Sequence, residues 1–138
     1  KGDAPARDLA AGQVVFDMLQ CARCHPAGDA AASAVGVAAT ELAPSLLLAD
    51  ERLRHDWVPA WIKDPQSWVA GTRMPANFQK MPDGSFKSPL VNAIDAPMFA
   101  RQKQELMRYF SSEEELRGYL ADVDRVTAAL RDHIWTLK

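Results

Sequence analysis

The pentapeptide CARCH, residues 21–25, constrains the fold and chemistry of this chain more than any other feature of its sequence. It holds the only two cysteines among 138 residues, Cys21 and Cys24, with two residues between them and His25 directly after the second. Two thiols at this spacing form a redox-active disulfide, bind a metal ion or attach a cofactor. The residues around the motif favour one of these three chemistries.

Zinc and a redox disulfide both fit the motif poorly. A zinc site on the two cysteines needs two further ligands, and besides His25 the only histidines are His55 and His133. A thioredoxin-like disulfide lies at the N-terminus of a helix after a strand, whereas a helical pattern precedes this pair. Covalent haem attachment needs two thiols for two vinyl groups and an adjacent imidazole for the iron. The motif supplies all of these groups.

The composition is that of one globular domain over residues 1–138. Apolar residues make up 48% of the chain and charged residues 25%. The 16 basic and 18 acidic residues are interspersed, so we expect no nucleic-acid or anionic-lipid partner. No apolar run is long enough for a membrane span, and the first residues lack the apolar segment of a signal peptide, as they would after cleavage of a leader.

Apolar residues at three- and four-residue spacing predict a helix at each end of the chain. The first covers residues 6–19 and runs into the cysteine motif. The second covers residues 112–137 and begins with Ser112 and Glu115 as a capping box. The cysteines are therefore expected at the end of a helix.

The middle of the chain is predicted to be rich in loops. A helix is expected over residues 51–63, and another over residues 95–110, with Asp95 as its cap and Pro97 in its first turn. Loops and turns are predicted over residues 27–45, 64–78 and 80–89. Because no strand pair with hairpin chemistry is found, the predicted fold class is all-α.

Three further segments resemble the class I cytochrome c family, in its monohaem bacterial form. GQVVF, with Gly12 and Phe16, is similar to the family's N-terminal helix. ELAPSL at residues 41–46 is similar to its proline segment, and GTRMP at residues 71–75 to the segment that ends in the distal ligand. The chain departs from the family at residues 78–110, an insertion before the C-terminal helix.

The resemblance implies one covalently bound haem c per chain. Cys21 and Cys24 would attach it, and His25 and Met74 would be the axial ligands of its iron. Met74 has competitors for the distal position: Met81, the next candidate, and Met98, His55 and His133. These competitors stay open here because a methionine is more often part of a core than a ligand.

Further residues are assigned to the haem pocket by the same resemblance. The carbonyl of Pro44 would accept a hydrogen bond from His25, and Asn77 would donate one to the methionine sulfur. Trp57 and Trp61 are expected to be walls of the pocket or core residues.

The resemblance also implies the class I cytochrome c fold, in which the N- and C-terminal helices cross around the haem. We expect Gly12 and Phe16 to meet residues 130–134 at this crossing. The insertion, residues 78–110, is expected to pack as a flap near the methionine side of the haem. It is too short for a separate core.

These expectations predict a one-electron carrier with a low-spin haem. Histidine and methionine together fill both axial positions, so no position is open for a substrate and we expect no enzyme. Redox proteins are the expected partners. Because thioether attachment normally takes place on the oxidising side of a membrane, the resemblance implies export to the periplasm with cleavage of a signal peptide. Two alternatives are a cytochrome domain or subunit of a larger oxidoreductase complex, and a haem-based gas sensor that exchanges its distal ligand.

Overall fold

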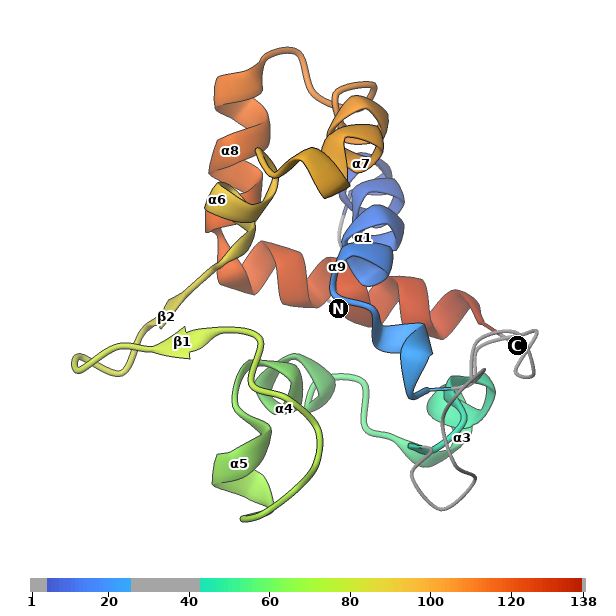
Figure 1. Ribbon diagram of the computed structural model, residues 1–138. Coiled ribbons are helices and arrows are strands. Elements are labelled where there is room, and N and C mark those ends of the chain that lie inside the picture. Colours follow the sequence, from blue (N-terminus) through green and yellow to red (C-terminus); the bar gives the residue numbers. More distant parts are fainter. Residues whose placement is uncertain (1–4, 26–42, 138) are drawn as a thin grey trace.

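The computed structural model describes residues 5–25 and 43–137, and in these ranges the protein is mostly helical (Figure 1). The all-α prediction is confirmed. Helix α1 (Ala6–Met18), at the N-terminal end, crosses helix α9 (Val123–Thr136), near the C-terminal end. Apolar side chains of both helices form the middle of the core: Ala11, Val15, Val126, Ala129 and Leu130. The loop expected over residues 27–45 lies almost entirely outside the described residues.

The crossing of the two terminal helices lies close to where the sequence predicts it. The ring of Phe16 meets the ring of His133 edge to face, with 4.8 Å between the ring centres. Gly12 lies against the backbone of Ala129, one residue before the expected stretch of 130–134. A residue without a Cβ is needed at this point because the two backbones approach so closely.

The C-terminal helix is interrupted, so the prediction of one helix over residues 112–137 was wrong. Helix α8 (Glu113–Ala121) ends before Asp122, where the chain turns into α9 (Figure 1). Asp122 leaves the helical conformation, and its carboxylate accepts a hydrogen bond from the backbone N–H of Arg125 at 3.1 Å, as an N-cap does. One half of the predicted capping box is confirmed, since the Ser112 hydroxyl accepts from the N–H of Glu115 at 3.1 Å. The Glu115 carboxylate accepts from the backbone N–H of Ser111 at 2.7 Å and not from that of Ser112, as a complete capping box requires.

The helix predicted over residues 51–63 is also divided. The chain first forms a 3₁₀ turn, η3 (Leu46–Leu48), and a short helix, α3 (Ala49–Arg52). It leaves the helical conformation over residues 53–57 and then forms helices α4 (Val58–Lys63) and α5 (Pro65–Trp68). A helix that ran through Pro59 would lose a hydrogen bond and bring the proline ring against a preceding carbonyl. Pro59 instead lies in the first turn of α4, where proline is tolerated.

Residues 79–87 form a short hairpin, which the sequence analysis did not predict. Strands β1 (Gln79–Lys80) and β2 (Phe86–Lys87) pair antiparallel. Between them the expected turn is present, with Gly84 at a φ of 90° and its N–H donating to the carbonyl of Met81 at 2.9 Å. Two-residue strands are too short to produce an alternating apolar pattern.

The helix predicted over residues 95–110 is shorter and has a different cap. Pro97 begins a 3₁₀ turn, η4 (Pro97–Phe99), which leads into helix α7 (Ala100–Leu106); a single turn of helix, α6 (Leu90–Ala93), precedes them. Asp95 was expected as the cap, but its carboxylate binds the Lys103 ammonium at 3.0 Å and the Arg117 guanidinium at 2.7 Å. These charged partners hold the side chain away from the helix N-terminus.

Helices α6 and α7 pack on α8 and α1 and do not form a flap near the methionine. In Figure 1 they lie on the opposite side of α9 from α3, α4 and α5. Leu106 of α7 and Phe110 after it are buried there. The apolar residues of this segment therefore cover the terminal helices, and only the hairpin extends from the loop that carries Met74.

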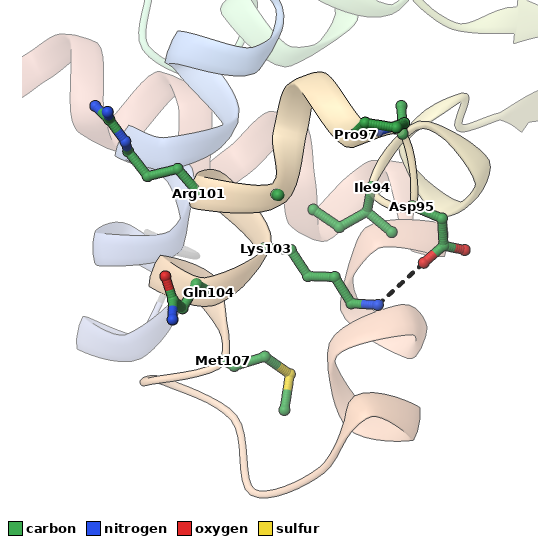
Figure 2. Close-up of a pocket in the computed structure, with 9 residues that line it drawn as sticks. Ile94, Asp95, Pro97, Arg101, Lys103, Gln104 and Met107 are labelled. Carbon is green, nitrogen blue, oxygen red and sulfur yellow. Dashed lines mark hydrogen bonds and ion pairs between the residues drawn. The ribbon is translucent and has the colours of Figure 1, made fainter.

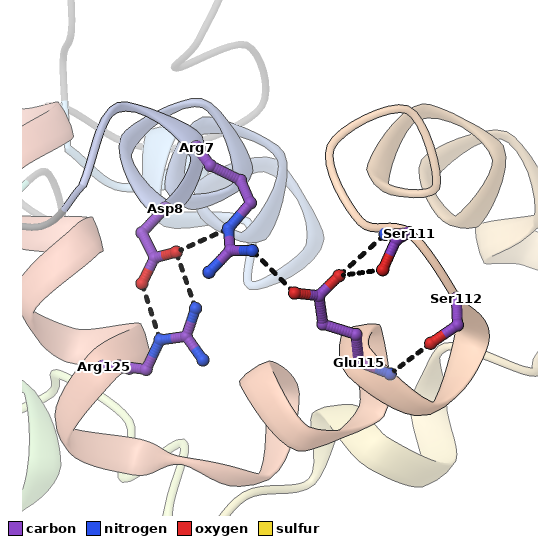
Figure 3. Close-up of polar contacts among 6 residues, drawn as sticks. All are labelled: Arg7, Asp8, Ser111, Ser112, Glu115 and Arg125. Carbon is purple, nitrogen blue, oxygen red and sulfur yellow. Dashed lines mark hydrogen bonds and ion pairs between the residues drawn. The ribbon is translucent and has the colours of Figure 1, made fainter.

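A polar cluster joins α1, α8 and α9 at this end of the molecule (Figure 3). The fully buried carboxylate of Asp8 accepts two hydrogen bonds from the Arg125 guanidinium, at 2.7 and 2.8 Å. Arg7 lies beside it and donates to Glu115 of α8 at 2.7 Å. Burial alone would raise the pKa of Asp8, but the two arginines outweigh it and hold the pKa below its ordinary value.

Candidate functional site

The cysteine motif forms a single tight turn directly after α1. Gln20, in the left-handed conformation with a φ of 57°, reverses the chain, and residues Cys21–Arg23 form a 3₁₀ turn, η1. The backbone N–H groups of Cys24 and His25 both donate to the carbonyl of Cys21, at 3.3 and 3.0 Å. Cys21 is half-buried against the core, Cys24 is exposed, and both thiols are free.

His25 is oriented by a hydrogen bond to the carbonyl of Pro44. The Nδ1 atom of His25 lies 2.8 Å from this oxygen, and the Ala43 N–H donates to the Cys24 carbonyl at 3.0 Å. Because a carbonyl only accepts, Nδ1 carries the proton in this pair. The neutral imidazole then presents the lone pair of Nε2, which is the atom that a metal ion binds.

Met74 lies in the loop between α5 and β1, and its sulfur is contacted by an indole. The Nε1–H of Trp61, on α4, donates to the Met74 sulfur at 2.8 Å. The backbone N–H of Met74 donates to the Thr72 hydroxyl at 3.3 Å. The side chain of Gln66 closes the loop, since its amide donates to the Thr72 carbonyl at 2.7 Å and accepts from the N–H of Gly71 at 3.1 Å.

Trp57 and Trp61 lie together beside this loop. Their ring centres are 5.2 Å apart, and Trp68 meets Trp57 edge to face at 5.7 Å. Trp57 and Trp61 are half-buried against the core, as are Met74 and Cys21, whereas Trp68 is 52% exposed. In Figure 1, η1 and helices α3 to α5 lie on the same side of α9. The fold thus places the turn that carries Cys21 on the same side of α9 as α4 and α5, which carry Trp61 and Trp68.

Asn77 is half-buried three residues after Met74. It was expected to donate to the methionine sulfur; the hydrogen bond that this sulfur accepts in the structure comes from the indole of Trp61. Sequence reasoning missed both Trp61 as a donor and Gln66 as the residue that closes the loop. Neither has a signal in the sequence, because each contact depends on how α4 and α5 fold back toward the loop.

The alternative distal ligands lie in other environments. His133 is buried at the crossing of α1 and α9, and His55 lies beside the carboxylate of Asp132, with 3.6 Å from Nε2 to the nearer oxygen. Met98 is 71% exposed and lies in η4, directly before α7. Met81, at the start of the hairpin turn, is the alternative nearest in sequence to Met74.

The environment of Cys21 disfavours this thiol as the nucleophile of a redox disulfide. Burial raises the pKa of its thiol to about 12, with a smaller contribution from the negative charge of Asp17. A reactive cysteine needs a lowered pKa, because the thiolate is the nucleophile. Among residues 5–25 and 43–137, no three or more His, Cys, Asp or Glu side chains are grouped so that they could hold a metal ion.

A surface pocket lies on the insertion, away from the predicted site residues (Figure 2). Its wall is formed by the end of α6, the turn after it and one face of α7, including Ile94, Asp95, Pro97, Lys103 and Met107. The Lys103–Asp95 ion pair crosses its rim. None of the residues predicted to bind haem lines it.

Comparisons of the chain with protein-family models, curated proteins and solved structures gave no match. In the parts of the chain that the structure describes, no helix has the length and apolar character needed to cross a membrane. The structure thus defines the protein as an all-α domain with a cysteine motif, an oriented histidine and a hydrogen-bonded methionine on one side of α9.

Proposed function

We propose that this protein is a monohaem c-type cytochrome of class I, which carries one electron at a time. Cys21 and Cys24 hold the haem through thioether bonds, and His25 and Met74 are the axial ligands of a low-spin iron. The observation that carries the proposal is the 2.8 Å hydrogen bond from His25 to the Pro44 carbonyl. It gives the histidine beside the two thiols the tautomer and fixed orientation that an iron ligand needs.

The other residues of the site fit the same group. A thioether is a soft, neutral ligand, and the Met74 sulfur is already held by the Trp61 N–H at 2.8 Å. The half-buried rings of Trp57 and Trp61 supply apolar surface for a porphyrin and exclude water from it. Asn77, three residues after Met74, is proposed to line the haem pocket on the side of the methionine ligand. A crossing of terminal helices next to the motif agrees with the fold that the resemblance implies.

The proposed ligands favour electron transfer over catalysis. When bound, the haem supplies a one-electron couple between ferric and ferrous iron. His25 and Met74 occupy both axial positions, which leaves no position for a substrate. The partners are then redox proteins that donate and accept the electron. Export to the periplasm, where thioether attachment takes place, is part of the proposal.

Covalent attachment tests the first part of the proposal. The chain is exported with a bacterial c-type maturation system, purified and extracted with acidic acetone. We expect the haem to stay with the chain and its mass to rise by one haem, and we expect Cys21→Ala and Cys24→Ala each to remove one thioether bond. Haem that passes into the solvent, or a chain of unchanged mass, contradicts the proposal. His55→Ala is the matched control and keeps attachment intact.

The distal ligand is tested by spectroscopy. The oxidised protein should have the weak red charge-transfer band of sulfur-bound ferric haem, and Met74→Ala should abolish it. Met81→Ala, the control, should leave the band unchanged; the reverse pattern assigns the ligand to Met81. Carbon monoxide should not bind the reduced wild-type protein. Rapid binding would indicate an open or exchangeable position, as in an enzyme or a gas sensor.

A further inference from the structure

We propose that Trp61 is a positioning residue for the axial methionine: its indole N–H donates to one lone pair of the Met74 sulfur and directs the other lone pair toward the iron. The inference rests on the proposed function, because it concerns the proposed distal ligand. It assigns to Trp61 a role that the sequence resemblance assigned to Asn77.

The contact itself is chemically specific. The Nε1–H of Trp61 lies 2.8 Å from the sulfur of Met74, and an indole N–H can only donate. A half-buried tryptophan N–H needs an acceptor, and a thioether sulfur is a weak acceptor with two lone pairs. When one pair accepts the hydrogen bond, a single pair remains to bind a metal. The hydrogen bond thus selects which face of the sulfur is presented.

The indole is held in place by its own helix and by neighbouring rings. Helix α4, which carries Trp61, packs on α9. The ring of Trp57 lies against that of Trp61 with 5.2 Å between centres, and Trp68 meets Trp57 at 5.7 Å. Trp61 therefore has little freedom to follow a moving methionine.

The methionine is held separately, by the loop on its other side. Thr72 accepts from the backbone N–H of Met74 at 3.3 Å, and Gln66 fixes Thr72 and Gly71 to α5 with hydrogen bonds of 2.7 and 3.1 Å. Since both partners are anchored by different elements of the protein, the orientation of the sulfur is built into the fold before any ligand is bound.

The consequences follow from the chemistry of sulfur. A hydrogen bond to the thioether withdraws electron density from it, so the sulfur stabilises ferric iron less and the reduction potential is higher. The same bond restrains the side chain, so exogenous ligands displace the sulfur less easily. The higher potential and the resistance to exogenous ligands should both be lost when the indole N–H is removed.

The test compares Trp61→Phe with Trp68→Phe in the haem-loaded protein. Trp61→Phe removes the donor and keeps an aromatic ring, and we expect a lower reduction potential, a shifted or weakened red band and a rise of about two- to tenfold in the affinity of the ferric protein for imidazole. Trp68→Phe changes the same aromatic cluster, at a ring that is 52% exposed, but keeps the donor. It should leave all three measurements near wild type.

Two results would overturn the inference. One is a Trp61→Phe protein with unchanged potential and imidazole affinity; the other is an equal change in Trp68→Phe, which would show that packing of the aromatic cluster alone matters. Asn77→Ala is made in parallel, and if it alone changes the potential, the donor is Asn77. If the wild-type protein carries no covalent haem or lacks the red band, the proposed function itself is wrong, whatever the tryptophan variants show.

A measurement on the wild-type protein removes any dependence on the folding of the variants. The chain has four tryptophans, so ¹⁵N-tryptophan labelling gives four indole N–H signals. In the ferric protein we expect one of these signals to be shifted far outside the range of the other three, because the Trp61 indole proton is hydrogen-bonded to a ligand of the paramagnetic iron. Four indole signals of ordinary shift would contradict the inference.

Discussion

Gly12 of α1 and Ala129 of α9 lie so close that a Cβ atom on Gly12 would stand 2.7 Å from the Ala129 carbonyl oxygen and 2.9 Å from the Ala129 Cβ. Both distances are shorter than any relaxed contact between such atoms, and the main obstacle is backbone, which cannot rotate away. Ala129 itself is fully buried. The two terminal helices can therefore cross at this distance only while residue 12 has no side chain.

The first prediction concerns this contact. Gly12→Ala should lower the free energy of unfolding by about 1–3 kcal/mol, because the added methyl group forces α1 and α9 apart. Helix propensity acts in the opposite direction by up to about 1 kcal/mol and does not cancel the clash. Chemical denaturation measures the difference.

Gly118 offers a matched control for this substitution. It lies in α8, and a Cβ built on it meets nothing within 4 Å. Gly118→Ala should stabilise the protein by about 0.5–1 kcal/mol through helix propensity. If Gly12→Ala were as stable as Gly118→Ala, the close contact would not limit the crossing.

The second prediction concerns the buried carboxylate of Asp8. Asp8→Asn keeps the shape of the side chain but removes the charge that Arg125 and Arg7 bind, and it should cost about 2 kcal/mol of unfolding free energy. Asp124→Asn in α9 is the control: Asp124 pairs with Lys63 at 2.7 Å but is 85% exposed. It should cost less than about 1 kcal/mol. Equal costs would mean that burial of Asp8 adds nothing to the pair.

The contribution of Asp8 should also depend on pH. The Asp8 pKa is held below its ordinary value near 3.8, so the folded state binds the proton less well than the unfolded state. Its stabilising contribution is complete above that value and is lost as the pH falls through the folded-state pKa. The difference in unfolding free energy between wild type and Asp8→Asn should therefore shrink below about pH 4. A constant difference down to pH 2 would contradict this.

Part of the fold could be predicted because its signals are local. The cysteine motif, the apolar spacing of α1 and the cap at Ser112 each depend on a few neighbouring residues, and each is present as expected. The crossing at Gly12 was also predictable, but only through the family resemblance. Periodicity alone does not say which helices meet.

The breaks between helices were harder to predict. Apolar residues keep a helical spacing through Asp122 and through residues 53–57, yet the chain leaves the helix at both places. At Asp122 the side chain competes for a backbone N–H, and before Pro59 a new helix begins. In each case a local alternative outweighs a weak preference for continuing, which a count of apolar positions does not include.

The contacts that complete the candidate site depend on tertiary structure. Trp61 and Met74 are 13 residues apart and belong to different elements, so no spacing rule joins them. The packing of α7 could not be predicted for the same reason. Its apolar residues indicate that one face of the helix is buried, but they do not indicate which surface of the protein it covers. The amphipathic pattern predicts burial and leaves the partner undefined.

A third prediction uses the titration of His133. Burial lowers the pKa of His133 from its ordinary value near 6.5, and the carboxylate of Asp17 opposes this only in part. The folded state thus prefers the neutral ring, and the associated stability is complete above pH 6.5 and is lost as the pH falls through the folded-state pKa. Unfolding free energies measured between pH 8 and 5 should fall more for wild type than for His133→Gln. Parallel profiles would show that His133 does not contribute; the other histidines are common to both proteins.

The last prediction concerns the insertion, residues 78–110. Leu106 is fully buried, and its helix α7 packs on α1, on the opposite side of α9 from α4 and α5 (Figure 1). Leu106→Ala should lower the unfolding free energy by about 2–5 kcal/mol, because it leaves a cavity in the core. Met98→Ala, at a side chain that is 71% exposed, should change it by no more than about 0.5 kcal/mol.

Leu106→Ala should at the same time leave the haem site unchanged. Under conditions where the variant is folded, the red band and the reduction potential should match those of wild type, because α7 packs on α1 and lies on the opposite side of α9 from α4 and α5 (Figure 1). This combination, a large loss of stability with an unaltered iron site, separates a core-forming insertion from a flap over the haem. A shift in potential as large as that of Trp61→Phe would mean that α7 is coupled to the methionine side after all.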